Sequence, residues 1–323
     1  LFLIDIYDDN YKKILTNFIS LDINEVIKQS VKILIVYTAI TLGLFLLYKI
    51  INLRAFDAFN LSLTVISSGG FLIVNNISEI LQSNFQVYIF SLSMLISFFG
   101  IFLPYNILFL KKKELLVFTE DYYLSIYFVI IFGIFFIFFN ESNNFASILF
   151  SLTSSISNIG FSIKTYDDNN FLYLILVIIG GSLVSTSSGL RFFKIFSLLK
   201  FSFNELLSHS KPKHILLNKV LFSKIKIDLN DINKYFFTVI IFILSLTFLI
   251  SLLTLFDITF EDSFKLGILT LMNTVNSNLH GLDNLNFDEF STSLKFILIT
   301  FMIIGRIEFI SILILIKKFV FKN

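Results

Sequence analysis

Ser67-Ser68-Gly69-Gly70-Phe71 is the first of three short turns that decide how this chain folds. The others are Ser157-Asn158-Ile159-Gly160-Phe161 and Ser277-Asn278-Leu279-His280-Gly281. Each turn follows a short, semi-apolar segment and lies between two long hydrophobic runs. Glycine adopts backbone angles that other residues avoid, so such turns can aim carbonyl oxygens at one point and replace the water around an ion. The repeat therefore predicts a pore built from re-entrant loops.

The composition indicates an integral membrane protein. Of 323 residues, 56% are hydrophobic and only 15% are charged, which exceeds what a soluble core of this size requires. Helices need roughly 20 apolar residues to cross a bilayer. Six runs approach or exceed that length, at 33–50, 87–110, 122–139, 171–184, 236–256 and 294–316.

Three shorter segments precede the turns, at 56–66, 145–156 and 263–275. Helices of this length cannot cross a bilayer, and their backbone groups need cover from protein or from a water-filled cavity. Their carboxyl ends carry partial negative charge, which suits a cation. We therefore expect an all-α membrane protein of repeated units, each made of helix, pore helix, filter loop and helix.

The domain boundaries follow from these units. We expect an amphipathic cytosolic or interfacial segment at 1–30, pore units at 31–113, 114–200 and 231–323, and a basic cytosolic connector at 201–230. Lys and Arg gather in alternate connections, which the positive-inside rule places in the cytoplasm. The connections with the turns carry acids, which as a set favour cations at the outer mouth, although any single acid is better explained as a solvated loop residue.

Mostly Gly, Ser and Thr fill the stretch from Gly180 to Gly189, in the middle of an apolar run. Such residues weaken a helix and allow irregular backbone where a cavity is lined, so we expect an interrupted helix that gates the pore; close helix packing is the alternative. Arg191 and Lys194 follow, either as anchors at the cytoplasmic surface or as charges in the conduction path.

Gly305-Arg306-Ile307-Glu308 places two charges in the last apolar run. Charges inside a membrane are costly and need partners. Because residues two apart do not face each other on a helix, Arg306 and Glu308 should each pair with another segment. We expect a structural clamp between units.

These residues resemble the membrane subunit of Trk/Ktr-type potassium uptake systems, nearer the Trk branch. Gly70-Phe71 and Gly160-Phe161 look like the second and third of the four filter turns in that family. The family's gating segment is similar to the stretch 180–194, in which the matching residues are Gly180, Gly181, Ser185, Thr186, Gly189, Arg191 and Lys194. Its last-helix motif is similar to 305–308.

The resemblance implies a potassium filter formed by Ser68, Gly69, Gly70, Asn158, Ile159, Gly160, Asn278, Leu279, His280 and Gly281. Three of the expected four units are present, so we expect a chain that begins inside a longer protein. Val184 and Ser188 replace loop glycines of the family. In the last turn, either His280 or Gly281 holds the filter position, and the His280 side chain either faces water or brings a titratable group close to the ion.

The resemblance also implies a homodimer in the cell inner membrane, with several spans and a cytosolic ring of nucleotide-binding regulatory subunits. Potassium is the transported ion, and we expect no cofactor, no nucleic-acid partner and contact with membrane lipid. A non-conducting regulatory paralogue is the alternative. An enzyme has little support, since only three His and no Cys occur and no His and carboxylate set suggests a metal site.

Overall fold

The computed structural model describes residues 26–74, 76–100, 118–139, 145–163, 170–182, 185–208, 229–275, 279–282, 285 and 287–306. These residues are almost entirely helical, so the predicted all-α class is confirmed. In chain order the helices are α2 (Val26–Ile50), α3 (Ala55–Ser67), α4 (Asn84–Phe98), α6 (Phe118–Phe139), α7 (Phe145–Ile156), α8 (Asn170–Ile178), α9 (Phe192–Ser208), α10 (Leu229–Thr254), α11 (Phe260–Met272) and α12 (Thr292–Arg306).

Short elements complete the chain. The 3-10 turns η3 (Ile77–Glu79) and η6 (Phe287–Glu289) follow the first and third short helices. Strands β1 (Ile179–Gly180) and β2 (Leu190–Arg191) pair in parallel, with Ile179 opposite Leu190. This pairing closes the loop that interrupts the fourth predicted span. Helix α8 ends at Ile178, directly before the Gly180–Gly189 stretch at which the sequence predicted an interruption.

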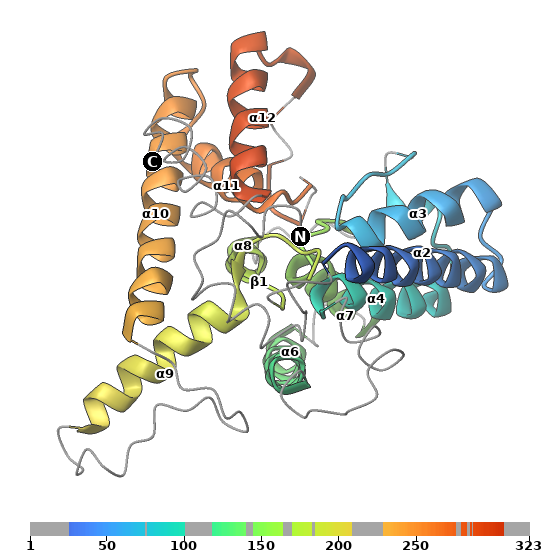
Figure 1. The fold of residues 1–323 in the computed structure, drawn as a ribbon. Helices are drawn as coiled ribbons and strands as arrows, with labels where there is room; N and C mark the ends of the chain where they lie inside the picture. Colours follow the sequence, from blue (N-terminus) through green and yellow to red (C-terminus); the bar gives the residue numbers. More distant parts are fainter. Residues whose placement is uncertain are drawn as a thin grey trace.

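Three short helices, α3, α7 and α11, each pack against a long neighbour (Figure 1). Helix α2 packs on α3, α10 packs on α11, and α6 packs on α7. The next contacts join successive groups: α4 packs against α7, and α8 packs against α11. In this way the last helix of one group supports the short helix of the next.

Local sequence explains several helix ends. At the start of α4 the Ser83 side chain accepts from the Gln86 backbone N–H at 3.3 Å, and Gln86 Oε1 accepts from the Ser83 N–H at 3.1 Å. This reciprocal capping satisfies donors that the first turn leaves open. Thr259 caps α11 in a similar way by accepting from the Asp262 N–H at 3.2 Å.

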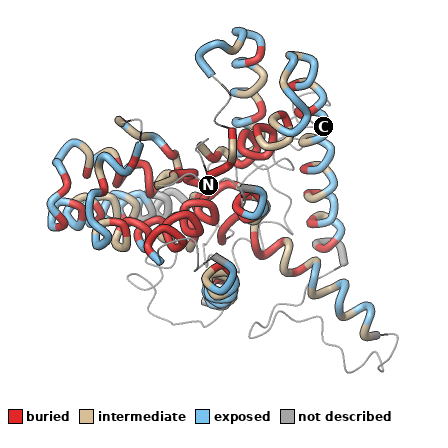
Figure 2. Tube along the Cα trace, turned by 180° about the vertical axis from the view of Figure 1, so that it is seen from behind, coloured by how far each residue is buried: buried red, intermediate tan, exposed pale blue. Residues whose placement is uncertain are grey.

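Burial is concentrated where the short helices meet, and the outer helices expose apolar side chains (Figure 2). Ile137 and Phe138 on α6 are each 76% exposed. Among the described residues, Glu120–Phe138 and Ile232–Thr254 are long and apolar enough to cross a membrane. An apolar surface around a polar-lined centre is the arrangement expected for a membrane protein, in which lipid covers the exposed side chains.

Candidate filter and gating loop

The loops after α3 and α7 have the same backbone construction. Ser68 and Asn158 end the helices in left-handed conformation, with φ of 51° and 59°. Two residues later Gly70 and Gly160 are also left-handed, with φ of 68° and 89°, a conformation that glycine adopts without steric cost. Both loops thus reverse direction directly at the carboxyl end of a short helix.

A hydroxyl on each short helix holds the returning chain. Thr64 Oγ1 donates to the Phe71 carbonyl at 2.8 Å, and Ser154 Oγ donates to the Phe161 carbonyl at 2.9 Å. Both bonds span seven residues. The sequence patterns around Gly70-Phe71 and Gly160-Phe161 therefore correspond to equivalent structures.

The loop after α11 begins in the same way. Asn273 is left-handed with φ of 51°, and its N–H donates to the Thr270 carbonyl at 3.2 Å. The next residue, Thr274, donates to the Leu269 carbonyl at 3.0 Å, as Gly69 does to the Thr64 carbonyl. By this register Asn273 corresponds to Ser68 and Asn158.

These three loops touch one another. Ser68 Oγ donates to the Ser157 carbonyl at 2.7 Å. The Asn158 side-chain amide donates to the carbonyls of Val177 and Met272, at 2.9 and 3.4 Å. The fully buried amide thereby links the second loop to α8 and to the end of α11.

Gly70 and Gly160 have no room for a side chain. A Cβ on Gly70 would overlap Val275 Cγ2 and lie 2.5 Å from the Ile159 carbonyl oxygen. A Cβ on Gly160 would overlap the Val275 carbonyl oxygen and lie 2.9 Å from Thr274 Cγ2. Glycine is required here both by backbone angle and by the closeness of the neighbouring loop.

The third predicted turn lies further along the chain. Leu279 packs in a hydrophobic cluster with side chains of α6, α7 and α8, and the Gly281 carbonyl accepts from Lys265 Nζ at 3.5 Å. Asn278 lies outside the described residues. The His280 side chain is fully buried, and neither ring nitrogen has a hydrogen-bond partner in the described part of the chain. The alternative in which His280 faces water is therefore wrong.

The segment predicted to gate the pore joins β1 to β2, and residues 183–184, which include Val184, lie outside its described part. Gly180 and Gly189 allow the two strands to approach, since a Cβ on Gly180 would overlap the Ser188 carbonyl oxygen. Gly189 is left-handed with φ of 95°. A Cβ on Gly181 would overlap the Phe98 carbonyl oxygen, so this glycine lets the loop touch the end of α4.

Arg191 holds this loop from within. Its Nη1 donates to the carbonyls of Ser182, Ser185 and Ser187, at 3.3, 3.2 and 2.9 Å, and to Ser185 Oγ at 3.1 Å. The guanidinium is thus turned into the loop, and the predicted role of Arg191 as a surface anchor is wrong. Lys194 on α9 is 4% exposed and lies beside it.

Further bonds fix the loop to its surroundings. The Ser182 N–H donates to the Phe98 carbonyl at 3.0 Å, and the Ser187 N–H donates to the Ser97 carbonyl at 3.1 Å. Thr186 Oγ1 reaches the same Ser97 carbonyl at 3.5 Å. The loop is therefore tied to the carboxyl end of α4.

Two acidic residues at the start of α6 complete this region. Glu120 Oε2 accepts from Ser182 Oγ at 3.1 Å, and Asp121 Oδ1 accepts from the Gly100 N–H at 3.2 Å. Each residue is 8% exposed. Sequence reasoning missed both, although two adjacent acids at the head of an apolar run were a signal for them.

Arg306 connects the loop between β1 and β2 to the end of α3. Its Nη1 donates to Ser188 Oγ and its Nη2 to the Ser67 carbonyl, both at 2.8 Å. These bonds join α12 to the segment between β1 and β2 and to the end of α3. Glu308, predicted as the second charge of the clamp, lies outside the described residues.

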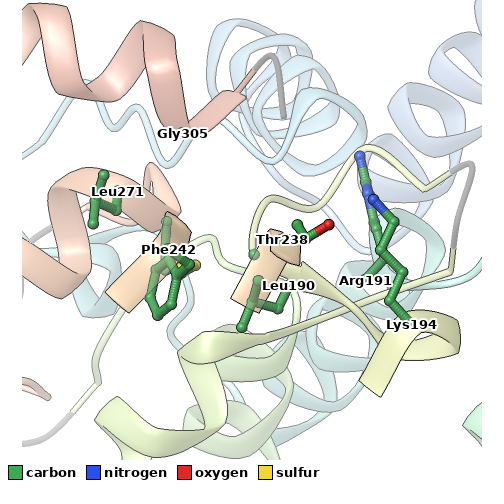
Figure 3. A pocket seen from close by; sticks show the side chains of 9 residues that line it. Leu190, Arg191, Lys194, Thr238, Phe242, Leu271 and Gly305 are labelled. Carbon is green, nitrogen blue, oxygen red and sulfur yellow. The ribbon is translucent and has the colours of Figure 1, made fainter. Parts of the chain in front are cut away.

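A small cavity, partly open to solvent, lies beside this region. Figure 3 shows Arg191 and Lys194 on one side of it and the apolar side chains Phe242 and Leu271 on the other. Among the described residues no group of three or more His, Asp or Glu side chains could hold a metal ion.

Comparison with solved structures shows which fold the chain shares. The chain superposes on the crystal structure of the potassium transporter TrkH from Vibrio parahaemolyticus with a TM-score of 0.79 and 20% sequence identity. The match covers 92% of this chain and 65% of that chain. No protein-family model and no curated protein matches the sequence. The chain therefore shares the fold of the helical membrane transporter TrkH. It spans less than two thirds of the length of the TrkH chain.

Proposed function

We propose that this chain transports potassium across the membrane through a pore lined by the filter loops at Ser68–Gly70 and Asn158–Gly160. The observation that carries the proposal is the meeting of left-handed loops at the carboxyl ends of short helices, in a fold shared with a potassium transporter. Helix carboxyl ends and loop carbonyls supply the partial negative charge that a dehydrated cation requires.

An unsatisfied oxygen at the filter supports a cation there. Asn158 Oδ1 is buried and has no hydrogen-bond partner among the described residues, while the amide nitrogen of the same side chain is used twice. A buried acceptor without a donor is costly. A cation beside the second loop would satisfy it.

The loop between β1 and β2 gates the pore in this proposal. The residues that would form or hold the gate are Gly180, Gly181, Ser185, Thr186, Gly189, Arg191 and Lys194. Arg306 bonds to both the loop and the first filter loop, so movement at the gate would reach the filter directly. By resemblance, the functional assembly is a homodimer in the inner membrane with a cytosolic nucleotide-binding ring, and it has no enzymatic activity.

Complementation tests the proposal. The full-length gene, expressed in a cell that lacks potassium uptake, should restore growth at low potassium. Gly160→Asp should abolish that rescue, because the new side chain would meet the Val275 backbone and Thr274. Rescue is compared at equal amounts of each protein in membrane extracts, since the variant also loses stability, and Gly133→Ala, made where a Cβ meets nothing within 4 Å, serves as the neutral control.

A specific observation favours the alternative, a non-conducting regulatory paralogue. The Ile159 carbonyl, which should face the ion, accepts from the Val275 N–H at 3.4 Å. If the wild-type protein reaches the membrane and gives no potassium-dependent growth, the conducting function is refuted and the alternative stands.

A further inference from the structure

The position equivalent to the filter glycines can be located in the third loop by helix length. Helix α3 starts at Ala55 and α7 starts at Phe145, and each filter glycine lies 15 residues after its helix start, at Gly70 and Gly160. Helix α11 starts at Phe260. The same spacing ends at Val275.

Backbone hydrogen bonds give the same register independently. The left-handed helix caps are Ser68, Asn158 and Asn273, and the filter glycines follow the first two caps by two residues. Val275 follows the third cap by two residues. His280 and Gly281 are seven and eight residues beyond that cap, and Gly281 is bonded to Lys265 on α11.

Contacts place Val275 where the other two loops meet. Its Cγ2 occupies the space that a side chain on Gly70 would need, and its carbonyl oxygen occupies the space that a side chain on Gly160 would need. Its N–H donates to the Ile159 carbonyl at 3.4 Å. Val275 is therefore in contact with both glycine loops at once.

We infer that Val275, and not His280 or Gly281, is the filter residue of the third unit, and that it restricts ion passage there. This inference rests on the proposed function and names the residue that limits ion passage through the pore. The left-handed residues of the described chain include Gly70 and Gly160 but not Val275, since a β-branched side chain disfavours that conformation. Its backbone consequently does not repeat the turn of the other two loops.

The restriction has two physical sources. The Val275 N–H occupies one acceptor site of the Ile159 carbonyl oxygen, which lowers the capacity of that oxygen to replace water around an ion. The isopropyl group also occupies the space where a side chain on Gly70 would lie. Val275→Gly removes the isopropyl group and permits the left-handed conformation of the other two loops. In the second loop the Gly160 N–H donates to the Ser154 carbonyl at 3.3 Å, and the same turn at residue 275 would direct its N–H away from Ile159.

Rubidium uptake by the full-length protein in uptake-deficient cells gives the first measurement. Val275→Gly should take up rubidium roughly fivefold to tenfold faster than wild type, the gain expected from turning one competing hydrogen bond away from the Ile159 carbonyl. His280→Gly represents the rival assignment. The inference is overturned if His280→Gly accelerates uptake more than Val275→Gly does.

A second measurement does not depend on transport. The chain contains no cysteine, so Val275→Cys and His280→Cys each add a single thiol to it. Silver ion should react with the thiol of Val275→Cys. Potassium should slow that reaction more than an equal concentration of choline does. The reaction of His280→Cys with silver should have the same rate in potassium and in choline. Equal rates in potassium and choline for Val275→Cys overturn the inference. Absence of uptake in wild type and every variant, with potassium protection at Val275→Cys intact, counts against the proposed function alone.

Discussion

Adding one methyl group at Gly160 tests whether the filter loops are packed as closely as the structure shows. In Gly160→Ala the new Cβ overlaps the Val275 carbonyl oxygen and lies 2.9 Å from Thr274 Cγ2, at a backbone φ of 89°. A non-glycine residue in a sparsely populated backbone region costs about 1–3 kcal/mol. Overpacking against backbone that cannot rotate away costs about 1–3 kcal/mol more. The variant should therefore lose roughly 2–6 kcal/mol of stability.

Gly133→Ala is the matched control, because it makes the same chemical change inside α6 where a Cβ meets nothing within 4 Å. Alanine is favoured over glycine within a helix by about 0.5–1 kcal/mol, so this variant should be unchanged or slightly more stable. Thermal unfolding of both purified variants in detergent, followed by rubidium uptake in cells, makes the comparison. Equal unfolding temperatures and equal uptake for the two variants would refute the close packing of the loops.

Three other changes test the contacts around the loop and the outer mouth. Arg306→Gln should lower the unfolding temperature and alter rubidium uptake, because it removes the hydrogen bonds from the guanidinium to Ser188 and Ser67. Hydrogen bonds from a charged donor are worth about 1.5–3 kcal/mol each. Lys295→Gln, at an exposed position of α12, should have little effect. Ser182→Ala should lose about 1–3 kcal/mol of folding stability, because it removes a hydrogen-bond donor from Glu120. Ser251→Ala removes only a hydrogen bond within α10 and should lose less stability in the same unfolding assay. The Lys265 ammonium donates to Glu261 at 2.6 Å and holds the pKa of that exposed carboxyl below its ordinary value of 4.5. The ion pair therefore stabilises the folded state at neutral pH. This stabilisation is lost as the pH falls through the folded-state pKa of Glu261. Unfolding temperatures measured across acidic pH should therefore fall less steeply for Lys265→Met than for wild type, and identical slopes would contradict this assignment.

Local pattern predicted most of the fold. Helix α7 has the bounds predicted from its apolar segment, and α3 differs from its prediction by one residue at each end. Both segments are bounded by turn-forming residues, which mark helix ends in the sequence. The interrupted region was also predicted from its glycines and hydroxyls, but its strand pairing was not, because a pair of two-residue strands has no sequence period.

The loop after α11 shows the limit of such patterns. Ser277-Asn278-Leu279-His280 is similar in residue types to Ser157-Asn158-Ile159-Gly160, and this similarity led to the prediction of a filter turn at 277–281. The position that we infer, Val275, depends instead on helix length and backbone bonding, and therefore on where α11 begins. The interpretation of Arg191 as a surface anchor came from its expected position near the membrane surface. The carbonyls that it binds belong to a loop whose path no local sequence pattern specifies.

The carbonyls held by Arg191 bear on how the loop between β1 and β2 could ever move. Three backbone oxygens of this loop, at Ser182, Ser185 and Ser187, depend on one guanidinium. Unpaired carbonyls in hydrocarbon cost several kcal/mol each. A movement that separated the loop from Arg191 would therefore need water molecules to bind these oxygens, whereas a movement in which Arg191 travels with the loop would not. Osmotic stress from solutes too large to enter the site distinguishes the two, because it would oppose only the movement that takes up water.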